Sequence, residues 1–390
     1  MKKLNVLYLI DSLHIFGGTE NYLFQLATNL NKDKFQAVVG HFAPEENEVI
    51  RKFRENGILI KYIPLDKIYD FNALKQAVVI KRLIKKYKID IVQTFHLSSD
   101  LFGTLVSRYA GVPVIISSRR DLGFCENNSF HHWARRIVNH QITKIHTVSK
   151  VVQNTICYKE HIPFSKTVTL YSGVNMERFN NSTCKITKKK ELKLNPEFPV
   201  IGTIANIKPI KGIEFFVEGA SIVLKSYPNS QFIIIGDDLV NTNGSNNSYK
   251  DKLDQQVETL GIRDNVHFLG KRFDIPEILQ IMDVYVSPSL SEGFSNTIIE
   301  SMATEKPVVA TDVGGNSEAV KNNRTGFIVP PKNAGTLADA VIRLLKNPEL
   351  GVKMGKAGKA RAKNLFSRKK MMSEMEFLYS SLHKENLNET

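Results

Sequence analysis

Short apolar segments alternate with amphipathic segments along almost the whole chain of 390 residues. In the first half, runs rich in Val, Ile and Leu predict β-strands at residues 4–10, 36–42, 90–95, 113–118, 144–149 and 167–171. Helical periodicity between them predicts helices at 19–30, 72–87, 98–109 and 130–140. Strands with so few polar positions are typical of a parallel sheet covered on both faces. The alternation predicts right-handed crossovers and a doubly wound α/β fold.

The alternation stops at 173–199 and then restarts. The stretch N-N-S-T-C-K-I-T-K-K-K-E-L-K-L-N-P is polar and basic, without a hydrophobic period, and it predicts a linker. The later strands are predicted at 200–205, 232–236, 266–270, 284–288, 307–311 and 326–329. The later helices are predicted at 211–227, 249–260, 276–282, 296–304 and 335–346, with a flexible loop at 241–248.

We therefore expect two α/β domains. The first comprises 1–175, the linker 176–199, and the second 200–365. Ligands of such sheets bind at the carboxyl ends of the strands, and clefts between domains are preferred sites. We expect a ligand cleft between the two domains.

The helix predicted at 72–87 is strongly basic. Its apolar positions favour a helix that packs on the sheet and turns its lysines to solvent; a membrane-surface helix is the alternative. These positions are Leu74, Ala77, Val78, Ile80, Leu83 and Ile84. Trp133, close to Arg135 and Arg136, has the same two interpretations, of which packing in the core is favoured.

The net charge of +14 is concentrated in the first half, because residues 1–180 carry 25 Lys and Arg against 15 Asp and Glu. This favours an acidic partner such as anionic lipid, a phosphorylated substrate or nucleic acid. A surplus of lysine for solubility explains the charge equally well. Three cysteines without metal-ligand spacing favour a reducing compartment. The apolar run at 4–10 is interrupted by polar residues, and it predicts a buried strand rather than a signal peptide.

The stretch S-E-G-F-S-N-T-I-I-E at 291–300 follows a predicted strand and opens a predicted helix. Ser295 or Asn296 is a natural N-cap, and free N–H groups at a helix start attract phosphate. Glu292 and Glu300 lie on either side of this point, where their carboxylates can accept hydrogen bonds from sugar hydroxyls. A capped helix with two surface glutamates is the alternative.

There are two more motifs, and each of them follows the first strand of one domain. In I-A-N-I-K-P-I-K-G, Lys211 opens a helix and can reach a diphosphate. In H-I-F-G-G-T-E, Gly17 and Gly18 allow the backbone to approach a ligand closely. A dinucleotide oxidoreductase would have G-x-G-x-x-G here, so that class is disfavoured.

Over nearly its whole length the sequence resembles the family-4 glycosyltransferases, retaining nucleotide-sugar enzymes of the GT-B fold with two Rossmann-like domains. E-G-F-S-N-T-I-I-E resembles the family's Glu-x7-Glu signature. The resemblance implies that Glu292 holds the donor sugar and Glu300 the nucleotide ribose. It implies that backbone amides from Phe294 through Ser295 and Asn296 to Thr297 meet the sugar and the diphosphate.

The resemblance extends to the other motifs. Lys211 matches a lysine that binds the diphosphate, Gly17 and Gly18 match a turn beside the donor phosphate, and His96 matches a histidine that contacts the transferred sugar. The resemblance thus makes Glu292, Lys211 and His96 the catalytic residues. The segment 366–382 resembles a helix that returns to the first domain, and closure of the cleft is expected about Gly173.

One position departs from the family pattern, because Asn206 stands where an arginine is common. An arginine would clamp the diphosphate from a second side. Lys208, Arg119 and Arg120 are the candidates to compensate for it.

The family implies transfer with retention from a nucleotide sugar, with a UDP-sugar favoured and no metal or other cofactor. It implies a glycan or lipid-linked acceptor in cell-surface polysaccharide or glycolipid synthesis. The basic first domain suggests contact with an anionic membrane from the cytoplasmic side, and no nucleic acid is expected. Another GT-B enzyme (a sugar-nucleotide epimerase or a phosphorylase) and a non-catalytic basic binding protein are the alternatives.

Overall fold

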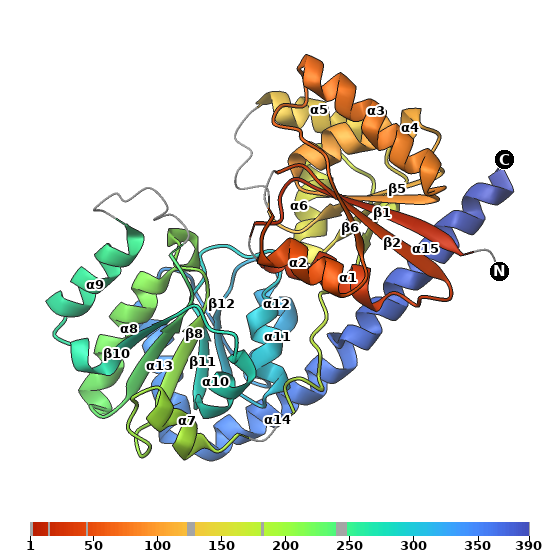
Figure 1. Ribbon diagram of the computed structural model, residues 1–390. Coiled ribbons are helices and arrows are strands. Elements are labelled where there is room, and N and C mark those ends of the chain that lie inside the picture. Colours follow the sequence, from red (N-terminus) through yellow and green to blue (C-terminus); the bar gives the residue numbers. More distant parts are fainter. Residues whose placement is uncertain are drawn as a thin grey trace. The chain divides into compact units, whose positions relative to one another are not determined.

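The computed structural model describes residues 3–14, 16–43, 46–122, 129–180, 183–238 and 248–389. The chain forms two compact units (Figure 1). Unit 1 comprises Met1–Ser172 and Lys369–Thr390, and unit 2 comprises Gly173–Arg368. Each unit is described by itself.

Unit 1 is built on a sheet of seven parallel strands in the order β3-β2-β1-β4-β5-β6-β7. The strands are β1 (Leu4–Ile10), β2 (Phe35–His41), β3 (Leu59–Tyr62), β4 (Ile91–Phe95), β5 (Val114–Arg119), β6 (Lys144–Thr147) and β7 (Thr167–Thr169). The central strand β1 pairs with β2 and β4 and is almost entirely buried, as its continuous apolar pattern predicts.

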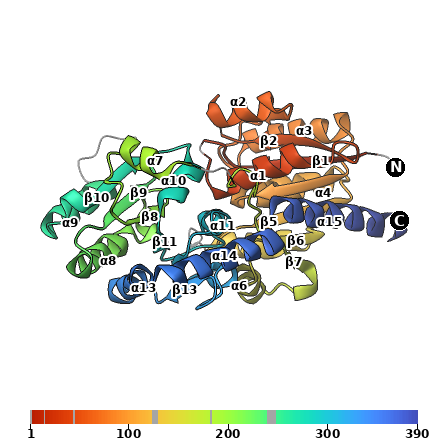
Figure 2. The same ribbon diagram turned by 90° about the horizontal axis from the view of Figure 1, so that it is seen from below.

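The helices of unit 1 are α1 (Gly18–Asn29), α2 (Glu48–Glu55), α3 (Phe71–Lys86), α4 (Thr104–Tyr109), α5 (Ser129–Asn139), α6 (Lys150–Glu160) and α15 (Arg368–Glu389). A π-helical turn, η1 (Ser99–Gly103), precedes α4, and a 3-10 turn, η2 (Phe164–Lys166), precedes β7. Although α15 comes last in the sequence, it lies against this sheet (Figure 2). The ring of Tyr379 meets that of Phe35 edge to face, with 5.9 Å between centroids, and the Tyr379 hydroxyl lies 3.2 Å from that of Tyr8.

Unit 2 is built on a second parallel sheet, in the order β10-β9-β8-β11-β12-β13. The strands are β8 (Val200–Ile204), β9 (Gln231–Ile235), β10 (Val266–Gly270), β11 (Val284–Ser287), β12 (Val308–Thr311) and β13 (Gly326–Val329). The two sheets confirm the doubly wound α/β fold expected for both halves of the chain.

The helices of unit 2 are α7 (Lys185–Glu191), α8 (Ile213–Ser226), α9 (Tyr249–Thr259), α10 (Ile275–Ile281), α11 (Asn296–Ala303), α12 (Asn316–Ala319), α13 (Ala334–Lys346) and α14 (Pro348–Leu365). Two 3-10 turns, η3 (Pro209–Lys211) and η5 (Arg263–Asn265), precede α8 and β10. The core lies between the sheet and the apolar faces of α8, α9 and α13.

Helix α7 lies within the segment whose polar pattern predicted a linker. It is held to the rest of unit 2 by ion pairs, because the Lys188 ammonium lies 2.5 Å from Asp274 and the Arg272 guanidinium lies 3.2 Å from Glu191. Such a helix has almost no apolar period to detect. The predicted loop at 241–248 lies outside the described residues except for Ser248, which caps α9.

The chain passes between the units at Ser172–Gly173 and again at Arg368–Lys369. Just inside unit 2 the two passing segments pair in parallel: the Val174 amide donates to the Phe366 carbonyl at 2.8 Å, and the Arg368 amide donates to the Val174 carbonyl at 2.8 Å.

Two expectations about burial in unit 1 are wrong. Leu74 and Val78 lie on the exposed side of α3, whose buried residues are Ala73, Gln76, Ile80, Leu83 and Ile84. Trp133, expected in the core, is exposed as well. These helices carry more apolar residues than the one face that packs on the sheet can bury.

The helices among the described residues are too short or too polar to cross a membrane. Cys157 and Cys184 are free thiols, and Cys125 lies outside the described residues.

Candidate functional site

The N-terminus of α11 forms the centre of the candidate site in unit 2. Ser295 is the N-cap residue, as predicted, but its hydroxyl makes no capping bond and lies 3.1 Å from the Thr297 hydroxyl. Thr297 accepts a second hydrogen bond, at 2.6 Å, from Tyr285 on β11. Since Ser295 and Thr297 bond each other, the Ser295 side chain leaves the N–H groups of the first helical turn to another acceptor.

Asn296 is the first residue of α11, and its carbonyl Oδ1 is buried with no hydrogen-bond partner among the described residues. A buried polar atom without a hydrogen-bond partner at a helix start is a common sign of a binding site, because the missing hydrogen bond lowers the free energy of unfolding.

Lys211 and Glu292 form an ion pair at the same edge of the sheet, with 2.6 Å between Nζ and Oε2. Lys211 ends the 3-10 turn η3 after β8, and Glu292 lies in the loop after β11. The Ser289 hydroxyl donates to the same carboxylate oxygen at 3.4 Å. A Cβ on Gly212 would collide with the Pro288 carbonyl, so only glycine lets η3 approach this loop so closely.

The loop that carries Glu292 is braced by the turn after β12. Gly314 has a φ of +51°, and a Cβ there would collide with the Glu292 carbonyl oxygen. The Gly315 amide donates to Gly293 at 3.1 Å, and the Thr311 hydroxyl donates to Ser289 at 2.6 Å. Sequence reasoning did not assign Gly314 to the site. The signal was a second Gly-Gly pair after a strand, like the pair at Gly17.

Glu300 lies one turn into α11. Burial raises the pKa of its carboxyl to about 7, and the positive charge of Arg178 acts in the opposite direction. The side chain keeps partial exposure to solvent. Glu300 can therefore accept hydrogen bonds from a ligand and gains its negative charge near neutral pH.

Phe294 turns its side chain away from solvent and packs on Phe366 at 5.3 Å between ring centroids. Only its backbone is thus available to a ligand. Asn206 follows β8 in the same unit, and Lys208 lies between it and Lys211. Asn206 offers an amide where an arginine was expected from the family pattern.

The predicted residues of unit 1 also lie at carboxyl ends of strands. Gly17 is the N-cap of α1 with a φ of −79°, so its backbone conformation does not require glycine. A Cβ on Gly17 would lie 2.6 Å from a carboxylate oxygen of Glu20, which is the flexible end of a side chain. Neither the backbone conformation nor a contact with a fixed group therefore requires glycine at position 17 in unit 1.

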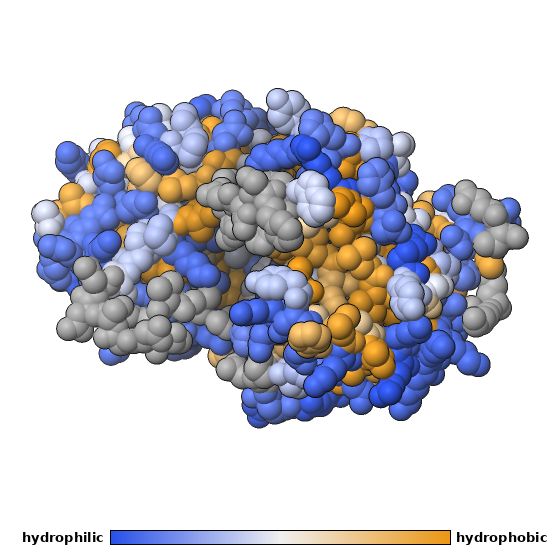
Figure 3. Space-filling view, turned by 90° about the horizontal axis from the view of Figure 1, so that it is seen from above, coloured by the Kyte–Doolittle hydropathy of each residue, from blue (hydrophilic) through white to orange (hydrophobic). Residues whose placement is uncertain are grey.

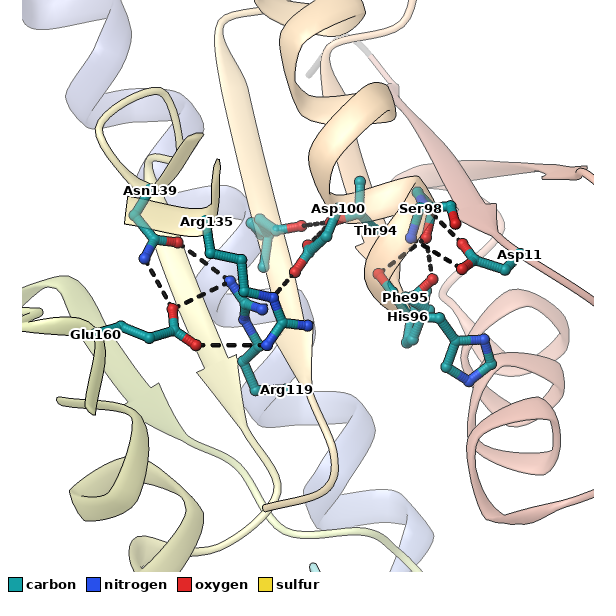
Figure 4. A network of polar contacts seen from close by, with 12 residues as sticks. Asp11, Thr94, Phe95, His96, Ser98, Asp100, Arg119, Arg135, Asn139 and Glu160 are labelled. Carbon is teal, nitrogen blue, oxygen red and sulfur yellow. Dashed lines mark hydrogen bonds and ion pairs between the residues drawn. The ribbon is translucent and has the colours of Figure 1, made fainter. Parts of the chain in front are cut away.

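His96 follows β4 in a left-handed conformation, with a φ of +70°. The Asp11 carboxylate, after β1, fixes the turn by accepting from the Ser98 amide at 2.9 Å and the Ser99 amide at 2.6 Å (Figure 4). Among the described residues the half-buried imidazole of His96 has no hydrogen-bond partner, and Figure 4 shows it pointing away from the polar network. This geometry does not match the alternative of a histidine that only makes structural hydrogen bonds.

Arg119 lies in a buried ionic network in unit 1, also shown in Figure 4. Its guanidinium lies 2.7 Å from Asp100 and 3.6 Å from Glu160, and it donates to Asn139 at 3.1 Å. Arg119 is therefore committed to structure and does not compensate for Asn206.

The adjacent Arg120 has a different environment. Its guanidinium lies 3.8 Å from the centre of the Tyr22 ring and donates to Ser172 at 2.9 Å. Burial lowers its pKa to about 10, so it stays charged at neutral pH.

The structure brings the predicted residues together as two groups. Unit 2 gathers Lys211 and Glu292 and, at the α11 N-terminus, the residues from Ser295 to Glu300, while unit 1 holds Gly17, Gly18 and His96. The described part of the chain contains no cluster of His, Cys, Asp and Glu suited to a metal ion. An anion with hydroxyl groups suits the unit 2 group, since it offers a cation, helix N–H groups and carboxylates.

Comparison with known proteins identifies the family of the chain. A family model described as "Glycosyl transferases group 1" matches residues 185–361, and one described as "Glycosyltransferase Family 4" matches residues 16–178. The UDP-Gal:α-D-GlcNAc-diphosphoundecaprenol α-1,3-galactosyltransferase of Escherichia coli is 27% identical over 78% of this chain and 79% of its own. A Staphylococcus aureus capsular polysaccharide glycosyltransferase, CapM, is 27% identical over 81% of this chain and 83% of its own.

Solved structures share the fold. A glycosyltransferase from Rickettsia africae superimposes with a TM-score of 0.88 at 24% identity, over 98% of this chain and 99% of its own. Anabaena HepE in complex with UDP superimposes with a TM-score of 0.86 at 22% identity, over 97% of this chain and 100% of its own. The two family models together span most of both units, and the chain therefore belongs to the family-4 glycosyltransferases and has their GT-B fold.

Proposed function

We propose that this glycosyltransferase moves a sugar from a nucleotide sugar, with a UDP-sugar as the favoured donor, to a lipid-linked or polysaccharide acceptor of the cell surface. The observation that carries the donor assignment is the group in unit 2: the Lys211 cation beside Glu292, together with the α11 N-terminus and Glu300. The relatives support the acceptor class, since their names include a diphosphoundecaprenol-linked sugar and capsular polysaccharide.

In this proposal unit 2 binds the donor. The diphosphate accepts hydrogen bonds from the free N–H groups at the start of α11, and Lys211 neutralises its charge. Glu300 accepts from the ribose hydroxyls and Glu292 from the sugar hydroxyls. In the absence of the donor, Lys211 is paired with Glu292. The anionic diphosphate of the donor therefore competes with the Glu292 carboxylate for this lysine.

We infer that transfer retains the anomeric configuration. The bond between the anomeric carbon and the diphosphate oxygen breaks, and the acceptor oxygen bonds to the same face of the carbon. The acceptor proton passes to the departing phosphate oxygen. Lys211 and the helix N–H groups stabilise the charge that develops on the leaving diphosphate, as fixed dipoles and cations do in other transferases. His96 contacts the transferred sugar.

We further infer that the reaction needs no divalent metal, since Lys211 and the α11 N-terminus supply positive charge where the leaving group departs. The enzyme would work at the cytoplasmic face of the membrane, where an acceptor such as the one named for the Escherichia coli relative is anchored by its lipid.

Thermal unfolding with UDP-, GDP- and ADP-sugars tests the donor assignment, because a ligand that binds the folded state raises the apparent stability. We expect UDP-sugars to raise the melting temperature, with and without EDTA, and slow hydrolysis to release a sugar of retained configuration by NMR. The absence of stabilisation by any nucleotide sugar would contradict the proposal, and a product of inverted configuration would contradict retention.

A further inference from the structure

Helix α3 of unit 1 carries an apolar stripe on its solvent side. Phe71 is 86% exposed, Leu74 66% and Val78 46%. These positions are three and four residues apart, so they line one side of the helix. The opposite side packs on the sheet, so the stripe is additional to the face that holds α3 in place.

The stripe continues onto α4, which packs beside α3. Tyr109 is 80% exposed, and Leu105, one turn earlier, is exposed as well. The Lys81 ammonium of α3 lies 4.6 Å from the centre of the Tyr109 ring, which joins the two helices at the surface.

Helix α5 adds Trp133 and Ile137, which are 60% and 46% exposed. Figure 1 shows α3, α4 and α5 at the same end of unit 1, and Figure 3 shows hydrophobic residues gathered on the face seen from there. We call this surface the apolar face; its residues are Phe71, Leu74, Val78, Leu105, Tyr109, Trp133 and Ile137. Exposed apolar groups so concentrated mark an interaction site.

The charges around the apolar face identify its partner. The sequences of α3, α4 and α5 contain no Asp or Glu. Exposed cations lie among the apolar residues: Lys75, Arg82, Lys85, Lys86 and Arg136. A second copy of this face would bring like charges together, whereas an anionic lipid surface would neutralise them while its acyl region covers the apolar side chains.

We propose that the apolar face docks unit 1 onto an anionic lipid bilayer, with its aromatic and aliphatic side chains at the headgroup boundary and its lysines and arginines on the lipid phosphates. The proposal deepens the proposed function, on which it rests for its biological sense, because a lipid-linked acceptor lies in such a bilayer. The sequence favoured a core Trp133 and a solvated α3 and kept a membrane surface as the alternative for both; the exposed side chains of α3, α4 and α5 favour that alternative.

Trp133 is the only tryptophan of the chain, so its fluorescence reports on the apolar face directly. The full-length protein is mixed with vesicles rich in phosphatidylglycerol and with vesicles of phosphatidylcholine alone. We expect a blue shift, and quenching by lipids brominated on their acyl chains, with the anionic vesicles only. Unchanged emission with both vesicles would overturn the proposal.

Co-sedimentation of matched variants locates the contact. Leu74→Gln/Val78→Gln keeps every charge and should lower the partition coefficient about tenfold, because apolar burial is lost. Lys75→Glu/Lys85→Glu should lower it more than tenfold and should remove most of its salt dependence, since each cation near an anionic surface contributes about fivefold. Val352→Gln, exposed on α14 in unit 2, is the control and should partition like the wild type.

Two further measurements separate this proposal from its rivals. Light scattering without lipid should show the same mass for the wild type and for Leu74→Gln/Val78→Gln; a dimer that this variant dissociates would overturn bilayer docking. Stabilisation by nucleotide sugars should be equal in all these variants. Loss of vesicle binding with intact donor binding therefore tests the apolar face, while loss of donor binding in the wild type would count against the proposed function instead.

Discussion

The ammonium of Lys211 lies 2.6 Å from the carboxylate of Glu292, although the two residues are 81 positions apart in the sequence. Lys211 follows β8 and Glu292 follows β11 at the carboxyl edge of the same sheet, and these two strands are neighbours. The pair holds in place a cation that can neutralise a departing diphosphate and an acid that can orient a sugar.

Lys211→Met should lower kcat about a hundredfold or more, since removing one preorganised donor of positive charge typically costs that much. The variant also leaves the Glu292 carboxylate without its cation, so it should weaken donor binding by repulsion. Steady-state kinetics and calorimetry with the donor would measure both effects. Lys211→Met/Glu292→Gln should regain donor affinity without regaining kcat.

The control is Lys225→Met, which removes an exposed lysine from the last turn of α8. It should match the wild type in both measurements. If Lys211→Met turned over at the wild-type rate, the role of Lys211 at the leaving group would be refuted.

Several strands could be predicted from the sequence with their exact bounds. The predicted ranges 4–10, 266–270 and 326–329 coincide with β1, β10 and β13. The edge strand β3 was missed because half of its residues are exposed and its apolar pattern is broken. Helix α14 was missed because its buried positions include Gly351, Gly355 and Gly358, which pack closely and carry no hydrophobic signal.

The residues of the candidate site could be predicted from the sequence, but the contacts between them could not. Glu292, Glu300 and Lys211 stand in local motifs, and each motif can be read without knowing the fold. The pairing of Lys211 with Glu292 and the support of Glu292 by Gly314 depend on which strands become neighbours. That information lies in the packing of the whole sheet.

Glu300 should make donor binding depend on pH. Because burial raises the pKa of its carboxyl to about 7, the better acceptor, the carboxylate, forms only as the pH rises through neutrality. UDP affinity measured by calorimetry should therefore increase between about pH 6 and about pH 8. Glu300→Gln should bind UDP more weakly than the wild type at high pH and should flatten the profile, whereas Glu300→Ala should mainly weaken nucleotide binding at every pH.

The same carboxyl should affect stability with the opposite sign. Its pKa is raised in the folded state from a usual value of 4.5, so the folded protein binds more protons than the unfolded chain across the window from 4.5 to about 7. The contribution is present below this window and is lost as the pH rises through it, by up to about 3 kcal/mol. Glu300→Gln should reduce this loss in urea unfolding. Equal pH dependence of unfolding in both proteins would argue against a raised pKa.

Gly314→Ala should damage the donor site through the backbone. The new Cβ would collide with the carbonyl of Glu292, so the loop that carries this acid must move. A φ of +51° adds about 1 kcal/mol of strain for a residue other than glycine. We expect weaker donor binding in calorimetry and a larger loss of stability than strain alone explains.

Gly261→Ala is the matched control for this substitution. Its φ is +66°, but no atom lies within 4 Å of the new Cβ, so the strain is similar and the collision is missing. This variant should lose about 1 kcal/mol of stability and keep its donor affinity. The proposed bracing fails if the two variants bind the donor equally well.

Asp11→Asn should slow sugar transfer through His96. The Asp11 carboxylate accepts from the amides of Ser98 and Ser99, and these bonds offset the left-handed backbone at His96, which costs about 1–2 kcal/mol. An asparagine has a single, uncharged acceptor oxygen, so the turn should relax and the imidazole should leave its position. We expect kcat to fall and the affinity for UDP to stay unchanged, because the nucleotide is assigned to unit 2.

The variant Asp90→Asn distinguishes an effect on kcat from a general loss of stability. Asp90 accepts a hydrogen bond from the Asn5 amide at 2.9 Å, near the opposite, amino end of the same strands. Both variants should lose stability in urea, but only Asp11→Asn should lose kcat. His96→Ala should lower kcat at least as far, and adding Asp11→Asn to it should cause little further loss, since the carboxylate acts through the histidine. If the two effects on kcat were simply additive, Asp11 would have a role independent of His96.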